Sequence, residues 1–295
     1  MIASMFELYL QVILYGVYIG SLYGLAAVGI ALMFGVMDIL QIAHGSIVML
    51  GGYLCFWLFQ LYRIDPLLSL PLVAAVFFIV GILLFKGIFA PVTKLSLDDK
   101  VKNSMLVAFG LILVLDNLTI MAFTGDIRTV SPWYQGTAFG FFGVRLPYVA
   151  LIGLLLAAFL TIGLNLFLKR TYIGKSIRAT AQNAESAALS GVSVSRTYAL
   201  AMAIATALGA IAGVLVLLYS GVDPAIGMDW TLKSLLITIL AGTGNIGGVF
   251  VCGLFFGILE GLGSIFIGPY KEVIGLTLFL GVLLWKPEGL FSKGT

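Results

Sequence analysis

The side chains able to carry acid–base chemistry are few, and they lie inside or beside long apolar stretches. The only histidine, His44, follows Asp38 at the border between two apolar segments, and Asp116 and Glu260 lie within others. Ionisable groups within membrane segments mark substrate or ion pathways by default, although Glu260 is equally suited to pairing with a cation. No second histidine or carboxylate cluster accompanies His44, so we expect neither a metal site nor a catalytic residue. His44 and Gly45 are instead candidates for lining a substrate path.

A glycine-rich sequence interrupts the longest apolar region, 232–266. It reads Gly242-Thr-Gly-Asn-Ile-Gly-Gly248 and matches the G-x-G-x-x-G pattern of dinucleotide sites, which requires a strand, a turn and a helix that an apolar membrane region does not offer. As one helix, 232–266 would reach about 52 Å at 1.5 Å per residue, far more than one crossing needs. We therefore predict a helix break at 242–248. Transporters expose backbone groups to substrate at such breaks, which makes Gly244, Asn245 and Gly247 further candidates for the substrate path.

The chain has no phosphate-binding motif of its own. A P-loop requires G-x-x-x-x-G-K-[ST]; Lys175-Ser176 follows Gly174, but residue 169 is Lys where the motif needs Gly, and the sequence before Lys233-Ser234 also fails. A single histidine limits acid–base chemistry near neutral pH. We expect the chain to be neither an enzyme nor the holder of a cofactor, so uphill transport would need a gradient or an ATP-hydrolysing partner.

The composition places the chain in a lipid bilayer. Of its 295 residues 61% are hydrophobic and 10% are charged, whereas soluble domains carry about 25% charged residues. Crossing the hydrocarbon core takes roughly 20 apolar residues. Besides 232–266, the candidate spans are about 8–33, 40–61, 69–89, 105–124, 147–168, 197–220 and 271–286. The expected fold is an all-α polytopic bundle of about 8 spans with broken or re-entrant helices, forming a single transmembrane domain over 1–295 with no nucleic-acid partner.

Glycines recur at four-residue intervals within three apolar segments. Small residues at this spacing share one helix face and let helix backbones approach closely inside a membrane. They are Gly16, Gly20 and Gly24; Gly209 and Gly213; and Gly253, Gly257 and Gly261. We expect tightly packed helix pairs at these positions.

The Lys and Arg residues outside the spans set the orientation, because positively charged loops stay in the cytoplasm. Four lysines follow the third span, and five of the chain's 16 Lys and Arg residues lie in the polar segment 169–196, whereas loops 62–68 and 125–146 hold only arginines 63, 128 and 145. Segments 86–104 and 169–196 are therefore expected inside and the N-terminus outside. The tail from Lys286 also has a cytoplasmic composition, and a break within 232–266 makes the span count agree with that side.

The polar segment 169–196 is too long and too compatible with helix to be a simple turn between spans. It contains one acid, Glu185, among its basic residues. A segment of this kind is placed to contact a cytoplasmic partner.

Several motifs, in order along the chain, resemble the branched-chain amino acid ABC permeases of the LivH/LivM type. The first are Gly16-Val-Tyr-Ile-Gly-Ser-Leu-Tyr-Gly-Leu-Ala-Ala-Val-Gly29, Gln41-Ile-Ala-His-Gly45 and Leu50-Gly-Gly-Tyr53. The family's second block usually reads Asn-Phe-Ala-His-Gly, so Gln41 and Ile42 depart from it. Parts of 174–191 resemble the family's coupling loop, and Gly242–Gly248 through Glu260 and Lys286–Phe291 resemble its closing signatures. The resemblance covers nearly the whole chain, whose length is closer to the LivH subunit.

This resemblance implies a permease of the bacterial inner membrane that imports amino acids, foremost Leu, Ile and Val, by alternating access. It implies a second homologous permease, two cytoplasmic ATP-binding subunits that bind the ATP, and a periplasmic substrate-binding protein. It also implies that 169–196 is a coupling loop, with a short helix at about 183–190 that docks on an ATPase subunit. The coupling candidates are Gly174, Arg178, Ala184, Glu185, Ala187, Ala188 and Gly191.

Three other functions stay open on the sequence. Within the same family, a permease for urea and short-chain amides or for aromatic acids fits the generic residues of the spans. A secondary transporter would use a proton or sodium gradient through Asp116, Glu260 or His44. A membrane scaffold or receptor subunit would use 169–196 to recruit a cytoplasmic partner without transporting anything.

Overall fold

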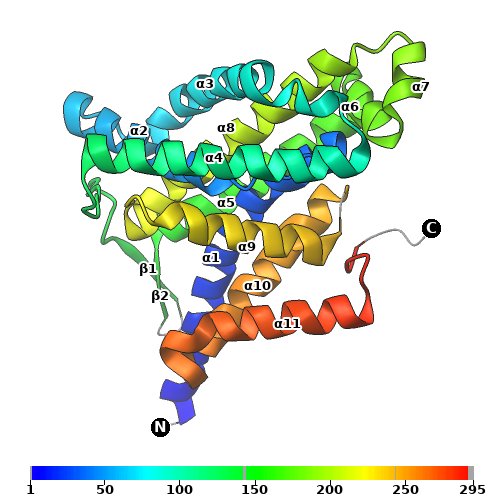
Figure 1. Ribbon diagram of the computed structural model, residues 1–295. Helices are drawn as coiled ribbons and strands as arrows, with labels where there is room; N and C mark the ends of the chain where they lie inside the picture. Colours follow the sequence, from blue (N-terminus) through cyan, green and yellow to red (C-terminus); the bar gives the residue numbers. More distant parts are fainter. Residues whose placement is uncertain (1, 142–143, 243, 292–295) are drawn as a thin grey trace.

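The computed structural model describes residues 2–141, 144–242 and 244–291, which form a bundle of long helices with one small hairpin (Figure 1). The helices are α1 (Ile2–Met37), α2 (His44–Tyr62), α3 (Pro66–Leu84), α4 (Leu97–Phe123), α5 (Tyr148–Arg170), α6 (Tyr172–Gln182), α7 (Ala184–Leu189), α8 (Val194–Ser220), α9 (Ile226–Ala241), α10 (Ile246–Ile267) and α11 (Lys271–Trp285). A π-helical turn (Phe85–Phe89) extends α3, and 3-10 turns (Val92–Lys94 and Gly268–Tyr270) precede α4 and α11. The all-α prediction is confirmed for the membrane part.

The hairpin was not predicted from the sequence. Strands β1 (Ala138–Phe141) and β2 (Val144–Pro147) pair antiparallel, with Ala138 opposite Pro147. They lie in the segment expected to be a plain loop between α4 and α5. Backbone N–H and C=O groups of an extended segment need hydrogen-bond partners. Here the two strands of the same segment provide these partners for each other. The side-chain amide of Gln11 on α1 holds the hairpin in place. Its Nε2 donates a hydrogen bond to the Arg145 carbonyl, and its Oε1 accepts one from the Arg145 N–H.

Seven helices of the described chain are long and apolar enough to cross a membrane: α1 from Glu7, α2, α3 with its π-helical extension, α4, α5, α8 and α10. Helices α9 and α11 have 16 and 15 residues. At 1.5 Å per residue they reach about 24 and 22 Å, less than the hydrocarbon thickness of about 30 Å. The segment 271–286, expected as a full span, is thus a shorter helix. The expected long region 232–266 is divided between α9 and α10, which confirms the predicted break.

The break is shorter than the predicted 242–248, because α10 already begins at Ile246. Gly242 and Gly244 adopt φ of 85° and 93°, a left-handed conformation that favours glycine and stops the helix. Asn245 then starts α10, since its side-chain oxygen accepts a hydrogen bond from the N–H of Gly248 at 3.0 Å. Gly247, predicted to lie in the break, belongs to the first turn of α10.

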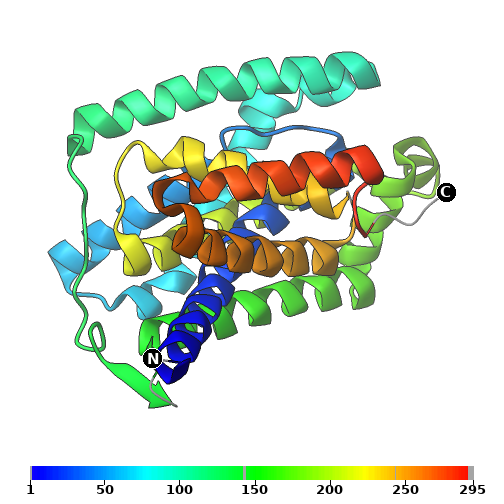
Figure 2. The same cartoon turned by 90° about the horizontal axis from the view of Figure 1, so that it is seen from below.

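The lysine-rich segments gather at one end of the bundle, called here the basic end. The connection from α3 to α4, helices α6 and α7, and residues 286–291 all lie there, at the right of Figures 1 and 2. The basic residues of this end are Lys86, Lys94, Lys100, Lys102, Lys169, Arg170, Lys175, Arg178, Arg196 and Lys286. This is the arrangement that the charge-based orientation requires.

Three loops contact one another at the opposite end. Arg128 and Val222 exchange two backbone hydrogen bonds of 2.8 Å, which join the loop after α4 to the loop after α8. The Tyr134 hydroxyl donates to Asp65 Oδ1 at 3.0 Å and joins the same loop to the α2–α3 connection. Burial and this hydrogen bond raise the pKa of Tyr134 above its ordinary value, so the hydroxyl keeps the proton that it donates.

Helices α1 and α10 pack closely against each other. Glycines of the two helices interdigitate: a methyl added to Gly16 would lie 2.8 Å from the Gly257 carbonyl oxygen, and one added to Gly20 would lie 2.6 Å from that of Gly253. The spacing of glycines predicted such packing. Only residues without a side chain allow backbones to meet this closely.

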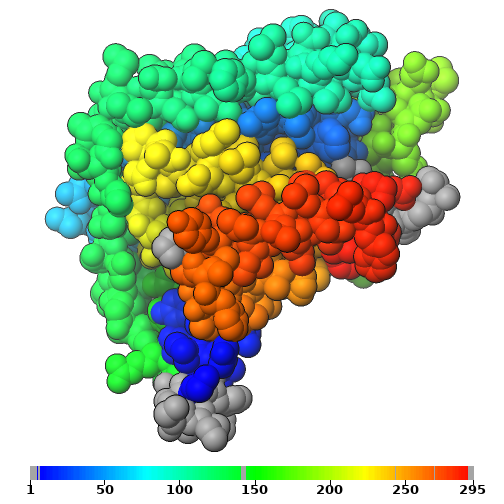
Figure 3. All heavy atoms as spheres, turned by 60° about the horizontal axis from the view of Figure 1, so that its bottom comes forward, coloured from blue at the N-terminus to red at the C-terminus, as the bar shows by residue number. Residues whose placement is uncertain are grey.

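The outward faces of α4 and α11 are apolar. Figure 3 shows α11 lying across the surface beside α9 and α10, with α4 at the far side of α9. Their exposed large apolar residues include Met105, Leu106, Phe109, Leu113, Leu118, Met121, Val273, Leu276, Leu280, Leu284 and Trp285. Surfaces of this kind are stable against lipid or another apolar surface rather than against water.

We expect Gly257→Ala to destabilise the protein. The new methyl would meet backbone atoms of Gly16 and Gly20, and overpacking of this type costs about 1–3 kcal/mol. Thermal unfolding of the purified protein in one detergent measures the effect. The matched control is Gly110→Ala on α4, where no atom lies within 4 Å of the added methyl. Equal melting temperatures for the two variants would contradict the close contact.

Candidate functional site

A cavity of about 600 Å³ opens at the basic end, between α1, α5, α6 and the break that precedes α10. Its polar lining comes from Asn165 and Lys169 of α5, Arg178 and Gln182 of α6, and Asn245. Gly35 near the end of α1, Gly244 and Phe291 complete the wall. The cavity brings together two predicted substrate-path residues, Gly244 and Asn245, and one predicted coupling residue, Arg178, which the sequence separates by more than sixty positions.

The tail beyond α11 closes one side of this cavity. The N–H of Leu290 donates to the Leu240 carbonyl at 2.8 Å, and that of Phe291 donates to the Ala241 carbonyl at 2.9 Å. These carbonyls end α9, where the break leaves them without partners in the helix. The Phe291 ring packs on Gly248, which has no side chain to displace it. The tail thus supplies the N–H donors that a further turn of α9 would otherwise have supplied.

His44 lies at the start of α2 and is fully buried between α1 and α8. A methyl at Gly29 or Gly209 would lie 2.7 or 2.8 Å from the imidazole, so these two glycines make room for the ring. Neither ring nitrogen has a hydrogen-bond partner among the described residues. The imidazole lines neither of the two cavities described for this structure. Its place in a substrate path stays a prediction.

Gly45 fixes α2 against α9. Its N–H donates to Thr231 Oγ1 at 2.9 Å, and the Thr231 hydroxyl donates to the Ile42 carbonyl at 2.8 Å. Gly227 of α9 lies so close to Gly45 that a side chain at position 45 has no space. In the conformation described here, Gly45 therefore serves as a backbone contact between two helices.

The two candidate acids near this region are bound by neighbours on α4 and α2. Asp38, with φ of 54°, follows the last residue of α1. Its carboxylate oxygen Oδ2 lies 4.0 Å from Lys100 Nζ. Asp116 of α4 accepts a hydrogen bond from the Ser46 hydroxyl at 2.8 Å. Asp38 thus links the connection from α1 to α2 with α4, and Asp116 links α4 with α2.

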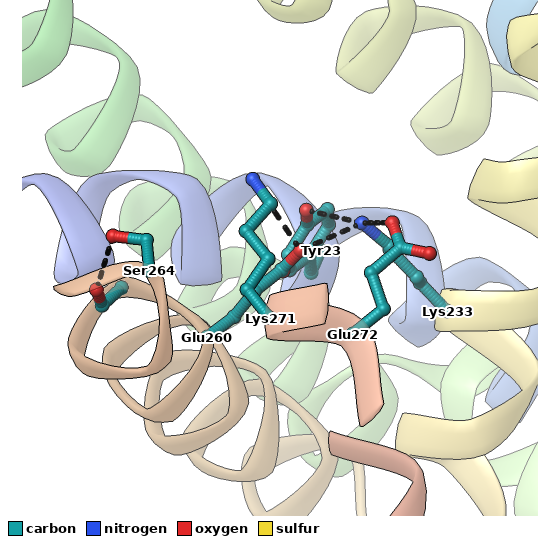
Figure 4. A network of polar contacts seen from close by, with 7 residues as sticks. Tyr23, Lys233, Glu260, Ser264, Lys271 and Glu272 are labelled. Atoms are coloured by element: carbon teal, nitrogen blue, oxygen red, sulfur yellow. Dashed lines mark hydrogen bonds and ion pairs between the residues drawn. The ribbon is translucent and has the colours of Figure 1, made fainter. Parts of the chain in front are cut away.

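Glu260 belongs to a network of polar contacts among four helices (Figure 4). Lys233 Nζ of α9 lies 2.9 Å from Glu260 Oε1 and 3.0 Å from Glu272 Oε1, and it donates to the Tyr23 hydroxyl at 3.0 Å. Lys271 Nζ is 3.7 Å from Glu260 Oε1. The structure therefore shows the pairing that was one of the two roles expected for Glu260. The sequence analysis gives Lys233 no role beyond its exclusion from a P-loop, yet a lysine within an apolar helix indicates a buried partner.

Helix α7 stands out from the basic end, and it confirms the short helix predicted at about 183–190. Asn183 begins it by accepting a hydrogen bond from the Ser186 N–H at 2.8 Å, and Gly191, with φ of 84°, follows its end. Glu185 and Ala188 are exposed, Ala184 is half-buried and Ala187 packs inward. Leu189 is 92% exposed, which is unusual for a large apolar side chain outside the apolar spans. It was not among the predicted coupling residues.

Helix α6 joins α7 to the bundle. Thr171 starts it by accepting a hydrogen bond from the Gly174 N–H at 3.0 Å. A methyl at Gly174 would collide with the backbone of Leu168 on α5, so this predicted coupling residue sets the sharp turn between α5 and α6. Arg178, one turn later, is exposed and faces the basic-end cavity.

Comparison with known proteins gives the family. A family model described as the branched-chain amino acid transport system / permease component matches residues 12–283. The chain belongs to this permease family. The permease is 28% identical to the high-affinity branched-chain amino acid transport system permease protein BraD of Pseudomonas aeruginosa, over 97% of this chain and 96% of that protein.

Two further relatives are named LivH and LivM. The permease is 28% identical to the high-affinity branched-chain amino acid transport system permease protein LivH of Escherichia coli K12, over 99% of this chain and 98% of the relative. It is 26% identical to the probable branched-chain amino acid transport permease protein LivM of Methanocaldococcus jannaschii, over 60% and 59% of the two chains. No solved structure matches the permease.

We expect Lys233→Met to destabilise the permease strongly. It leaves Glu260, whose side chain is 4% exposed, without its closest cation, and breaking a buried ion pair costs about 3–5 kcal/mol. The double variant Lys233→Met with Glu260→Gln should recover most of the loss, because no buried charge is left unpaired. Melting temperatures in detergent measure both, with exposed Lys102→Met as the control. A double variant no more stable than Lys233→Met would contradict the pairing.

Proposed function

We propose that this permease is the membrane subunit of an ATP-driven importer in the bacterial inner membrane. It would carry branched-chain amino acids from a periplasmic binding protein to the cytoplasm, beside a second homologous permease and above two cytoplasmic ATPases. The observation that carries the proposal is the exposed helix α7 at the basic end, where Leu189 is 92% exposed. Only Asn183 separates α7 from α6, which lines the cavity. The names of the BraD and LivH relatives as branched-chain amino acid permeases support the substrate class.

The proposed coupling path is short. Movement of α7 by an ATPase subunit would displace α6, which follows the sharp turn at Gly174 and presents Arg178 to the cavity. The opposite wall of that cavity contains Asn245 at the start of α10. Packed helices switch between discrete arrangements rather than deform smoothly, so a displacement of α6 would change the cavity at the helix break.

The chemistry of this cavity suits a passing carboxylate. The N-terminus of α10 opens onto it, and the positive end of a helix favours negative charge. Arg178 and Lys169 add positive charge to the same space. Transporters use the ends of interrupted helices in this way for anionic groups of substrates.

Substitution of Leu189 tests the docking role of α7. We expect Leu189→Glu to weaken association with the ATPase subunits about tenfold or more, as for a buried apolar anchor of an interface, and to reduce uptake in parallel. Leu189→Met should retain both. The control is Leu97→Glu, an exposed leucine at the same end in the first turn of α4, where two acids already follow. Normal ATPase association of Leu189→Glu would overturn the docking role.

The energy source has its own test. In proteoliposomes that contain the permease with its co-purified subunits, uptake of labelled leucine should require ATP and continue when a protonophore and a sodium ionophore collapse the gradients. The permease sequence contains no P-loop, so the ATP dependence of uptake must come from the co-purified subunits. Uptake that needs a gradient and ignores ATP would instead identify a secondary transporter.

A further inference from the structure

Helix α4 is the least buried of the seven candidate spans. Only 17% of the residues in its most apolar stretch are buried, against 28% or more in each of the other six. It runs along one edge of the bundle, at the top of Figure 2. One face of α4 packs on the permease through four buried residues, Ser104, Ala108, Ile112 and Thr119. The opposite face is open to the surroundings of the permease.

This open face carries an asparagine and a glycine. Asn117 and Gly110 are both exposed. They are seven residues apart, so at 3.6 residues per turn they lie on the same side of the helix, two turns from each other. Leu106, Leu113 and Met121 share that side, and each is at least 50% exposed. These five residues are called here the α4 outer face.

The Asn117 amide has hydrogen-bonding groups that the described residues leave unused. Its Nδ2 donates to the Leu113 carbonyl at 2.7 Å, and no described residue donates to its Oδ1. A carboxamide has two N–H donors and an acceptor oxygen with two lone pairs, so one donor and the acceptor remain for another molecule.

Asn117 lies at the depth of the hydrocarbon. The first turns of α4 are polar and belong to the basic end, so its apolar part runs from Met105 to Phe123 and reaches about 28 Å. Asn117 is six residues, or about 9 Å, inside the far end of this stretch. Lipid tails offer no hydrogen-bond donor, and polar side chains within a span therefore face protein or a water-filled space. The amide thus indicates that lipid does not cover this face in the working protein.

Gly110 points to the same conclusion by a different route. A methyl added there would meet no atom within 4 Å, so the packing of this chain does not require a glycine. Glycine within a helix is unfavourable relative to alanine. At the contact of α1 with α10, glycines are explained by the close approach of two backbones. The same explanation at Gly110 requires a helix from another chain.

Together, the two residues select the class of partner. A soluble protein does not reach a surface at hydrocarbon depth. A lipid tail fits beside Gly110 but has nothing to donate to Asn117. A transmembrane helix satisfies both residues, because its backbone can approach a glycine closely and its polar side chains can bond an amide.

We propose that the second homologous permease packs on the α4 outer face, with a helix against Gly110 and a hydrogen-bonding side chain opposite Asn117. The existence of that second permease rests on the proposed function. A homologous chain of the same fold can present its own α4, related by a two-fold axis along the membrane normal, so that the two helices contact through equivalent faces. An amide suits such a contact because it both donates and accepts.

Photo-cross-linking tests this surface in the permease with its co-purified subunits, reconstituted in nanodiscs. The photoreactive residue p-benzoylphenylalanine replaces Leu113, which lies between Gly110 and Asn117 on the same face. We expect a cross-link to a helix of the second permease, identified by mass spectrometry of the joined peptides. The matched control carries the same photoreactive residue in place of Phe159 of α5, which is 72% exposed on another span, and it should give little or no cross-linked protein.

Three cross-linking results would overturn the proposal. The first is no cross-linked protein from position 113. The second is equal yields from positions 113 and 159. The third is a cross-link from position 113 to a second copy of this chain, which would make the partner identical instead of homologous.

Two variants measure the contacts at Gly110 and Asn117 separately, by energy transfer between labelled permeases in proteoliposomes. Gly110→Leu should weaken association with the second permease about tenfold or more, because the new side chain separates the backbones. Asn117→Leu removes one interhelical hydrogen bond and should weaken association about threefold to tenfold. Both variants change exposed positions, so the melting temperature of the isolated permease should stay unchanged.

The matched control for these variants is Gly163→Leu on α5, where an added methyl also meets no atom within 4 Å. It should associate with the second permease within about twofold of the wild type. Unchanged association of both α4 variants, or an equal loss in Gly163→Leu, would overturn the proposal.

Uptake separates this inference from the import function. ATP-dependent leucine uptake by a complex in which position 113 gives no cross-link would refute the surface and leave the import function intact. A cross-link from position 113 to the second permease, in a complex that does not transport leucine, would support the surface and refute the import function.

Discussion

Glycine faces glycine where α1 meets α10, and the two backbones approach more closely than any side chain would allow. Both cavities of the permease are built on this helix pair. Gly35 and Asn245 line the cavity at the basic end, and Gly16 and Glu260 line the other. Because the two helices pack along most of their length, a tilt of either one would change the shape of both cavities.

The charges inside the bundle are arranged so that lipid-facing helices stay joined. Lys233 on α9 contacts carboxylates on α10 and α11 and the Tyr23 hydroxyl on α1. Helices α9 and α11 are too short to cross the hydrocarbon by themselves, and apolar packing alone gives little preference for one neighbour over another in lipid. Pairing of opposite charges supplies that preference, since a separated lysine or glutamate in hydrocarbon is costly.

Features that depend on local sequence could be predicted, and features that depend on distant pairing could not. The break before α10 followed from the length of the apolar region and its glycines, and the position of α7 followed from the family resemblance. The contact of Gln11 with the β1–β2 hairpin, the contact of the tail with α9 and the partners of Lys233 each join segments far apart in the chain, which no periodicity reveals. Of the site residues, Gly244, Asn245 and Arg178 were named from the sequence, but their shared cavity became visible only in the fold.

The bonds from Leu290 and Phe291 to the last carbonyls of α9 also say something about the order of biosynthesis. When α9 leaves the ribosome, the residues that will complete its final turn have not been made. The exposed carbonyls must stay in contact with water or the insertion machinery until α10, α11 and the tail have followed. This part of the permease is therefore completed only after α10, α11 and the tail have been made, even if the earlier helices enter the bilayer one by one during synthesis.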